Sequence, residues 1–370
     1  MDLVGMIRRN AVVSASLVLA LASMLVVPPS MDTLELVDVD VILVLFTLMA
    51  AVAGMTACGL FSTLADGMVS RGRTARGVCL TLVMLPFLTS MLITNDVALI
   101  TFVPLAAAVL SGAGRRDLLI PVLVLQTIAA NLGSCLTPVG NPQNLFIFSH
   151  YSPGIAEFVT TMLPVTVVGA AAVVAGTLLA CKGDVGSPER QSTGIRRRGM
   201  LCVMAVVFLV GVLSVAGFVP SWLCAPVALL AVLATDRGIL RDIDYGLLLT
   251  FVFLFVFTGN LAQVPEVSSF LGGLMSSDPV LTSALSSQVI SNVPAAMMLS
   301  QFTADWQGLL LGVSIGGLGT PVASMASLIT IRIHSRMEGA DTTGFMKWFL
   351  ASNIALLTVL LLMQGMTSPS

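Results

Sequence analysis

A carboxylate stands among small polar residues at the centre of an apolar stretch, in the sequence LITNDVALI. The carboxylate is Asp96, and Thr94 and Asn95 precede it. Ionisable residues at membrane depth mark ion and proton sites, and amide and hydroxyl oxygens can share such a site. Asp96 is the only one of the 19 acidic residues that the topology derived below places within the membrane. Asp96 therefore has a proton or sodium coupling role, or caps a helix that begins at Val97, and the two roles can coexist.

A second polar stretch runs from Asn131 to Phe146 and reads NLGSCLTPVGNPQNLF. Its glycines and prolines interrupt a helix, and irregular backbone at membrane depth is tolerated only inside the protein or along a watery cavity. The interruption frees helix N-termini, which attract anions, and carbonyl groups, which can coordinate cations. We expect a binding site here, although Thr137 and Pro138 could form an ordinary kink and the later amides could cap the second half-helix. The candidate binding residues are Asn131, Gly133, Thr137, Pro138, Asn141 and Asn144.

Both motifs recur in the second half of the chain. The stretch IGGLGTPVASMASLI, residues 315–329, repeats the interrupted helix at a separation of 183 residues, and VISNVPAAM repeats the polar tip at a separation of 197. Recurrence in the same order indicates an internal repeat. Asn95 and its equivalent Asn292 either contact a ligand or satisfy the backbone of their own turns. The candidate binding residues of this half are Ser291, Asn292, Gly316, Thr320, Pro321 and Ser324.

The elements that carry these motifs are those of a membrane protein. Hydrophobic residues make up 56% of the 370 residues and charged residues only 10%, whereas about 25% is ordinary for soluble domains. The six cysteines are scattered singly, which argues against a disulfide framework and a metal site. No convincing cleavage site follows the first apolar run, so we expect that run to be retained. Spans are predicted near residues 11–28, 38–60, 118–150, 155–181, 199–218, 221–235, 244–262, 306–331 and 345–365.

The 17 Lys and Arg residues fall into six clusters, separated by segments without basic residues. By the positive-inside rule the clusters are cytoplasmic, which predicts a cytoplasmic N-terminus and an external C-terminus. Segments 77–111 and 267–302 each start and end on one side, so each is either two full spans or a re-entrant hairpin. Because each carries a polar tip, we predict hairpins, and the two halves are then inverted repeats. The predicted parts are repeat one, 1–181, with its hairpin and the broken helix 118–150; a cytoplasmic linker, 182–198; and repeat two, 199–370, with its hairpin and the broken helix 306–331.

Four motifs in this order, ITNDVALITFVPL, NLGSCLTPVGNPQNLF, SNVPAAMML and GGLGTPVASMASLI, resemble the ion transporter superfamily. That superfamily includes arsenite permeases, sodium/proton antiporters and the divalent-anion/sodium symporters that carry citrate. The resemblance implies an all-α elevator-type transporter, in which hairpins and broken helices move against a scaffold, and a homodimer. In the dicarboxylate symporters both hairpin tips read Ser-Asn-Thr. Here the third tip positions are Asp96 and Val293, which departs from that pattern twice.

The function predicted from these features is secondary active transport of a small inorganic or carboxylate anion across the cytoplasmic membrane, coupled to H⁺ or Na⁺. A sodium/proton antiporter is the alternative, and a channel is a weaker one. An enzyme is not expected, since the spans carry no Ser/His, paired-aspartate or HExxH constellation and the chain no nucleotide-binding GxxxxGK[ST] sequence. We expect no cofactor and no structural metal, a coupling Na⁺ at Asn95, Asp96 and Asn292, and as partners an anionic solute, the lipid bilayer and a second copy of the chain, but no nucleic acid.

Overall fold

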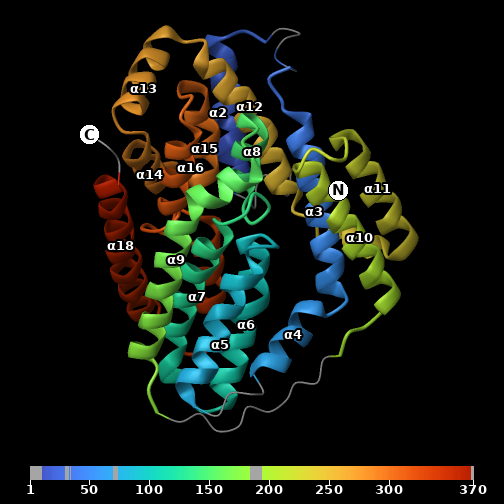
Figure 1. Ribbon diagram of the computed structural model, residues 1–370, viewed down its shortest axis with the longest axis vertical. Coiled ribbons are helices and arrows are strands. Elements are labelled where there is room, and N and C mark those ends of the chain that lie inside the picture. Colours follow the sequence, from blue (N-terminus) through green and yellow to red (C-terminus); the bar gives the residue numbers. More distant parts are fainter. Residues whose placement is uncertain (1–10, 30–32, 34, 70–73, 184–193, 368–370) are drawn as a thin grey trace.

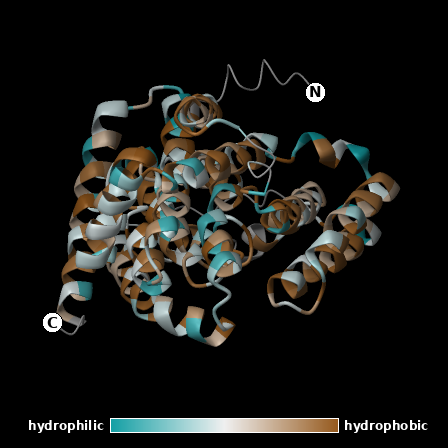
Figure 2. Cartoon of the chain, turned by 90° about the horizontal axis from the view of Figure 1, so that it is seen from above, coloured by the Kyte–Doolittle hydropathy of each residue, from teal (hydrophilic) through white to brown (hydrophobic). Residues whose placement is uncertain are grey.

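The computed structural model describes residues 11–29, 33, 35–69, 74–183 and 194–367, and every regular element in these residues is a helix (Figure 1). Seven of the described helices are long and apolar enough to cross a membrane. Leu179, Val206 and Leu230, on three outer helices, are each more than half exposed. Figure 2 shows hydrophobic residues along the outer helices as well as inside. The predicted all-α membrane fold is confirmed.

The first half of the chain contains a helical hairpin followed by an interrupted helix. The hairpin consists of α5 (Ala75–Thr89) and α6 (Asn95–Gly112), and the interrupted helix of α7 (Leu119–Ser134) and α8 (Pro142–Tyr151). Residues 135–141 between α7 and α8 are not helical, and we call them the first break. The other described elements of this half are α2 (Ala11–Val26), α3 (Val39–Ala57), α4 (Leu60–Val69), the 3-10 helix η2 (Arg116–Leu118) and α9 (Ile155–Ala180).

The second half repeats this order. Its hairpin consists of α14 (Pro279–Ile290) and α15 (Asn292–Leu299), and its interrupted helix of α16 (Trp306–Ile315) and α17 (Met325–Ser335). Residues 316–324 form the second break. The other described elements are α10 (Arg198–Val215), α11 (Ser221–Thr235), η3 (Arg237–Arg241), α12 (Tyr245–Ala262), α13 (Pro265–Ser277), η4 (Ser300–Phe302) and α18 (Thr342–Thr367).

The stretch 267–302, which we predicted as one hairpin, contains three helices rather than two. Asp278 ends α13, and its carboxylate accepts a hydrogen bond from the backbone N–H of Leu281 at the start of α14. Pro279 then occupies the first helical position, where its missing N–H costs nothing. The hairpin proper therefore begins at Pro279, and α13 is a separate helix before it.

Two groups of helices stand out among the packing contacts of the described elements, while α2 and α12 pack mainly on each other. Helices α3, α10 and α11 pack on one another at one side of the molecule (Figure 1). In the other group α5, α6 and α9 pack against α7, α14 and α15 pack against α16, and α17 contacts both α6 and α7. Figure 1 shows the hairpin α5–α6 in one half of the long axis and α14–α15 in the other. Hairpins that approach from opposite ends are what inverted repeats predict.

Each hairpin packs closely on the helix before its break because a glycine stands there. A Cβ atom on Gly133 would lie 2.0 Å from the carbonyl oxygen of Phe87, and one on Gly316 would lie 2.8 Å from Cα of Ala284. Phe87 and Ala284 occupy equivalent hairpin positions, as do the two glycines in the interrupted helices. Any side chain at Gly133 or Gly316 would therefore push the hairpin away.

Candidate functional site

The first hairpin tip is hydrogen-bonded to the first break in the interior of the protein. The backbone N–H of Asn95 donates to the carbonyl of Gly140 at 3.3 Å, and the hydroxyl of Thr137 donates to the carbonyl of Met91. Asn95 is 2% exposed. The hydroxyl of Thr137 thus faces the hairpin and holds it, rather than facing a cavity.

The second hairpin tip makes the same two bonds with the second break. The backbone N–H of Asn292 donates to the carbonyl of Ala323 at 3.0 Å, and the hydroxyl of Thr320 donates to the carbonyl of Gln288 at 2.9 Å. Each break residue lies 183 residues after its equivalent in the first half, and each hairpin residue 197 residues after. The structure therefore brings tips and breaks together, as we predicted, through bonds that recur in both halves.

Asn131, on the last full turn of α7, links the two halves. Its side-chain oxygen accepts hydrogen bonds from Nδ2 of Asn95 and from Oγ of Ser324, each at 3.0 Å. Its Nδ2 donates to the carbonyl of Gly317 at 3.3 Å. Asn131 is 2% exposed, so these bonds replace water completely. One buried amide thus joins the first tip to the second break.

Gly317 brings the second tip to the same place. A Cβ atom added there would lie 3.2 Å from Nδ2 of Asn292, which is 3% exposed. The carbonyl of Gly317 already accepts from Asn131. Ser291, beside Asn292, has a positive φ of 74° and directs its hydroxyl to the carbonyl of Ala323 at 3.4 Å. Asn95, Asn131, Asn292 and Ser324 therefore gather around the second break.

Asn144 fills the first break from its own second helix. Its Nδ2 donates to the carbonyls of Ser134 and Thr137 at 3.0 Å and to that of Cys135 at 3.3 Å. Nδ2 of Asn141 donates to the hydroxyl of Ser134 at 3.0 Å. These bonds satisfy carbonyls that the end of α7 leaves free. Nδ2 of Asn144 thus caps the end of α7. The alternative that we considered, capping of the second half-helix, is not seen, because its N-cap Asn141 makes no side-chain capping bond.

Gln288 bonds the free carbonyls of the second break, as Asn144 does in the first, although Gln288 belongs to the hairpin. Its Nε2 donates to the carbonyls of Gly316 at 2.7 Å and Leu318 at 2.9 Å, and its Oε1 accepts from the backbone N–H of Thr320 at 2.8 Å. Sequence reasoning missed this residue. The available signal was an amide in an apolar helix, one turn before the tip.

The two prolines of the Thr-Pro pairs lie inside the breaks. Pro138 is buried, and Pro321 is partly exposed. Neither proline belongs to a helix, so both breaks are true interruptions rather than kinks in continuous helices. The structure therefore excludes the alternative that the two Thr-Pro pairs are ordinary kinks in continuous helices.

Asp96 lines a cavity of about 430 Å³, which we call the Asp96 cavity. Its Oδ1 is buried and has no hydrogen-bond partner among the described residues. Helix α6 begins at Asn95 with Thr94 as its N-cap, so Asp96 is not the cap that we considered. Asp242 and Asp244, which we placed at the end of a span, line the same cavity. The full lining is formed by Leu48, Met49, Val52, Ala53, Thr56, Ala57, Leu92, Ile93, Thr94, Asp96, Val97, Ile100, Thr101, Val139, Phe208, Asp242, Asp244 and Leu247.

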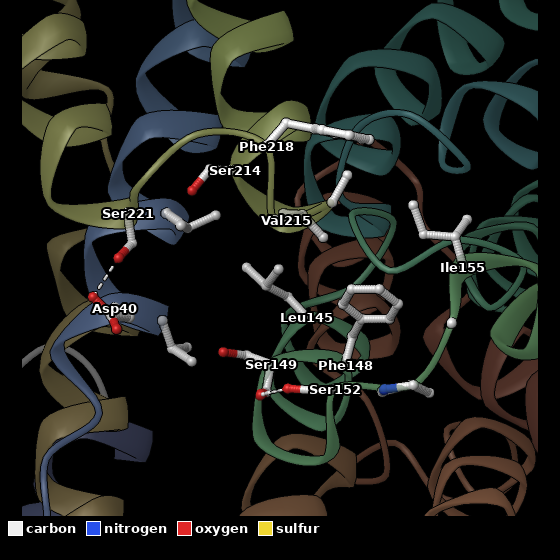
Figure 3. Close-up of a pocket in the computed structure, with 16 residues that line it drawn as sticks. Asp40, Leu145, Phe148, Ser149, Ser152, Ile155, Ser214, Val215, Phe218 and Ser221 are labelled. Carbon is white, nitrogen blue, oxygen red and sulfur yellow. Dashed lines mark hydrogen bonds between the residues drawn. The ribbon is translucent and has the colours of Figure 1, made fainter.

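A second cavity, of about 560 Å³, lies between α3, α8, the start of α9 and the α10–α11 connection (Figure 3). We call it the Asp40 cavity. In Figure 3 Asp40 and Ser221 meet at one wall, where the hydroxyl of Ser221 donates to the carboxylate, while Leu145 and Phe148 extend from α8 at the other. Among the described residues that line the two cavities, none is Lys or Arg. An anion in either cavity would depend on N–H groups and hydroxyls.

The polar contact between α7 and α17 also escaped sequence reasoning. The hydroxyl of Thr127 donates to the carbonyl of Leu123 and lies 2.8 Å from the hydroxyl of Thr330, and both threonines are fully buried. Gln126 was missed as well. Its Nε2 donates to the carbonyls of Leu82 at 2.8 Å and Phe102 at 3.3 Å, one on each arm of the first hairpin. Within the described residues, no group of three or more His, Cys, Asp or Glu side chains is placed to hold a metal ion.

Comparison with known proteins agrees with this architecture. A family model described as citrate transporter matches residues 3–307. An uncharacterized transporter of Methanocaldococcus jannaschii is 34% identical over 268 residues, which are 71% of this chain and 72% of the relative. The inner membrane protein YbiR of Escherichia coli is 32% identical over 321 residues, 80% of each chain.

Two further similarities are more distant. The silicon efflux transporter LSI3 of rice is 30% identical over 139 residues, 37% of this chain. The crystal structure of the YdaH transporter of Alcanivorax borkumensis superposes with a TM-score of 0.52 over 89% of this chain and 85% of that one, at 16% identity. The latter similarity supports the fold alone.

Proposed function

Because the chain belongs to the citrate transporter family, we propose that it is a secondary active transporter that moves a small inorganic or carboxylate anion across the cytoplasmic membrane, driven by H⁺ or Na⁺. It is a multi-pass membrane transport protein and not an enzyme. The proposal concerns the solute, the driving ion and the mechanism. Its orientation, with a cytoplasmic N-terminus and an external C-terminus, and its homodimeric state are proposed with it.

The observation that supports this proposal is that each hairpin tip is hydrogen-bonded to the break of its own half, while Asn131 joins the first tip to the second break. Paired, interrupted helices that meet inside the protein are typical of the substrate site of secondary transporters. Helix N-termini at the tips and the first break keep free N–H groups, because the N-caps Thr94, Asn141 and Ser291 make no side-chain capping bond. Such N-termini attract anions without any Lys or Arg.

The two cavities support alternating access. Both lie beside α3, which contributes Val41 and Val44 to the Asp40 cavity and Leu48 and Val52 to the Asp96 cavity. A solute held at the breaks can reach one cavity or the other if the hairpins and interrupted helices shift along α3. We propose this shift as an elevator movement of the second helix group against α3, α10 and α11.

Asp96 is the proposed coupling residue. Its carboxylate stands next to the tip residue Asn95, and one of its oxygens is buried without a partner. A charge at that depth is costly, and binding a proton or Na⁺ removes the cost. Asn95 and Asn292 supply amide oxygens for Na⁺. The three carboxylates Asp96, Asp242 and Asp244 in one cavity also favour the second candidate, a sodium/proton antiporter.

Counterflow in proteoliposomes tests the proposed transport. Vesicles loaded with an unlabelled solute should accumulate the labelled solute from outside, which carriers show and channels do not. The solutes to compare are citrate, succinate, arsenite and, because a relative is named for silicon efflux, silicic acid. Counterflow of none of them, with protein correctly inserted, would contradict the proposal.

Asp96→Asn tests coupling in the same vesicles. The amide keeps the size but cannot exchange a proton or carry the charge that holds Na⁺. We expect counterflow to survive and accumulation driven by a pH or sodium gradient to fall at least about tenfold, the loss expected when about 1.4 kcal/mol of coupling is removed. Undiminished gradient-driven accumulation would exclude the coupling role. Thr101→Val, on the same helix and the same cavity, is the control and should keep both activities.

A further inference from the structure

We propose that the first turn of α8 selects carboxylates that also carry a hydroxyl group, and that Gln143 is the residue that recognises this hydroxyl. The inference rests on the proposed transport of an anion and names the class of anion. Gln143 stands in the first turn of α8, two residues after the first break.

The side chain of Gln143 is buried without any hydrogen-bond partner. It is 0% exposed, and neither its Oε1 nor its Nε2 has a partner among the described residues. Gln126 and Gln288 are also amides in apolar surroundings, but both place Nε2 on backbone carbonyls. Burial of an unsatisfied amide is costly, so a lone unpaired carboxamide indicates a group that binds there in another state of the protein.

The backbone of the same turn offers free donors. The N-cap Asn141 makes no side-chain capping bond, and Pro142, at the first helical position, has no N–H. The N–H groups of Gln143 and Asn144 therefore remain for a ligand, at the positive end of the α8 dipole. Oδ1 of Asn144 is also buried without a partner, while its Nδ2 is fixed by three carbonyls of the break. The turn is thus held rigidly while its free groups stay unpaired.

The unpaired groups of this turn include both donors and acceptors, and a ligand that satisfies them has to carry both kinds of group as well. Two backbone N–H groups and Nε2 of Gln143 are donors, which fit a carboxylate. Oε1 of Gln143 and Oδ1 of Asn144 are acceptors, and a carboxylate has no hydrogen to give them. A hydroxyl on the same molecule has one hydrogen to donate to one of these oxygens, so a hydroxycarboxylate leaves one acceptor fewer unpaired than a plain carboxylate does.

The first turn of α8 lies between residues that line the two cavities. Val139, just before it, lines the Asp96 cavity, whereas Leu145 and Phe148, just after it, line the Asp40 cavity (Figure 3). Gln143 itself lines neither cavity, so a ligand bound there would be reached from the Asp96 cavity or the Asp40 cavity only after the turn moves. This is the location that a site in alternating access requires.

The second break has no counterpart to this turn. The residue equivalent to Gln143 is Ala326, whose backbone N–H is already capped by the hydroxyl of Ser324 at 3.2 Å. Hydroxyl recognition is thus assigned to one half of the site only, and a single substitution should remove it.

The test compares two acids that differ only in one hydroxyl, citrate and tricarballylate. Each competes against labelled citrate for counterflow by the full-length protein in liposomes. Because an unpaired buried acceptor weakens binding, we expect citrate to compete at least about tenfold better than tricarballylate. Gln143→Met keeps the length and removes both polar atoms, so we expect the ratio to fall to about one while tricarballylate still competes.

Gln126→Met is the matched control. It makes the same chemical change on α7, where the amide only ties the hairpin arms together, so it should lower thermal stability and leave the ratio unchanged. If Gln143→Met does not fold, Gln143→Asn withdraws the amide by one methylene and should also reduce the ratio. Equal competition by both acids in the parent protein, or an unchanged ratio in a folded Gln143 variant, would overturn the inference and leave anion transport standing. Competition by neither acid would contradict the carboxylate part of the proposed function as well.

Discussion

In the first break the free carbonyls are bonded by Asn144, which belongs to the break's own second helix, whereas in the second break they are bonded by Gln288, which comes from the hairpin. Both arrangements satisfy the carbonyls that end a helix inside the membrane. The carbonyls of the first break are therefore satisfied by a residue of the interrupted helix itself, whereas those of the second break are satisfied only while the hairpin contacts the break. A movement that separates hairpin from break should cost more in the second half.

The two breaks also differ in their equivalent side chains. At separations of 183 residues, Asn141, Gln143 and Asn144 correspond to Ser324, Ala326 and Ser327. The first break thus carries amides, which both donate and accept, and the second carries hydroxyls and a methyl group. The backbone bonds between tip and break are thus the same in both halves, while the side chains that could recognise a solute differ. Such a difference allows two similar halves to bind an asymmetric solute.

Asn131 joins the first hairpin tip to the second break, so its loss should have the largest effect. Asn131→Ala leaves Nδ2 of Asn95, the hydroxyl of Ser324 and the carbonyl of Gly317 without their partner. Each buried group left unpaired costs about 1–3 kcal/mol, so we expect a loss of on the order of 4 kcal/mol in the free energy of unfolding and no transport. Unfolding in mixed detergent micelles measures the first, and counterflow the second.

Asn353→Ala is the control for that prediction. Asn353 is also fully buried, but it bonds only the carbonyl of Phe349 within α18. We expect it to cost about 1 kcal/mol and to preserve transport. Equal losses at Asn131 and Asn353 would mean that Asn131 is an ordinary buried amide and does not join the halves.

Asn144→Ala and Ser327→Ala compare the breaks directly. Asn144→Ala removes one amide from three carbonyls and should cost about 2 kcal/mol. The hydroxyl of Ser327 is buried without a partner among the described residues, so its removal breaks no hydrogen bond and should change stability by less than about 1 kcal/mol. Denaturation of the two variants under the same conditions provides the measurement. A larger loss for Ser327→Ala would break the comparison, because the second break would then not depend on Gln288.

The smallest effect concerns Thr127 and Thr330. Their repeat equivalents are Leu310 and Ile147, so the other pair of half-helices has apolar residues where this one has a hydrogen bond. Thr127→Val or Thr330→Val should each cost about 1 kcal/mol, because each removes the shared hydrogen bond while the remaining hydroxyl keeps a backbone carbonyl. The double variant loses the shared bond only once, so it should cost less than the sum of the two single variants. Additive losses in the same unfolding assay would show that the two hydroxyls do not depend on each other.

Much of the fold could be predicted from the sequence because its signals are local. Apolar runs predict spans, and Gly and Pro at Gly133, Pro138, Gly316 and Pro321 predict the breaks. The repeat predicts which tip meets which break, and the contacts of Asn95 and Asn292 agree with it. The family and the all-α membrane fold are confirmed, whereas the inverted orientation and the solute remain predictions.

What escaped prediction depends on packing between distant segments. The boundary between α13 and α14 depends on local capping by Asp278, a signal that is present in the sequence. The prediction missed this boundary because a single long hairpin agreed equally well with the positions of the basic residues. The bonds of Gln126 and Gln288 depend on which helix face meets which carbonyl, and no spacing rule reports that. For the same reason Asp96, Asp242 and Asp244 could be identified as acids but not as neighbours.

The bonds of Asn131 have a consequence for biosynthesis. Its partners Gly317 and Ser324 follow it in the sequence by 186 and 193 residues, and Thr330 follows its partner Thr127 by 203 residues. Ribosomes add about 5–20 residues per second, so the first half spends roughly 10–40 s in the membrane before these partners exist. During that time its polar groups face hydrocarbon unless Asn95, water or the insertion machinery covers them. The polar groups of the first half therefore have to be covered until the second half has been synthesised, and a chain that ends before Gly317 lacks both partners that the second half provides for Asn131.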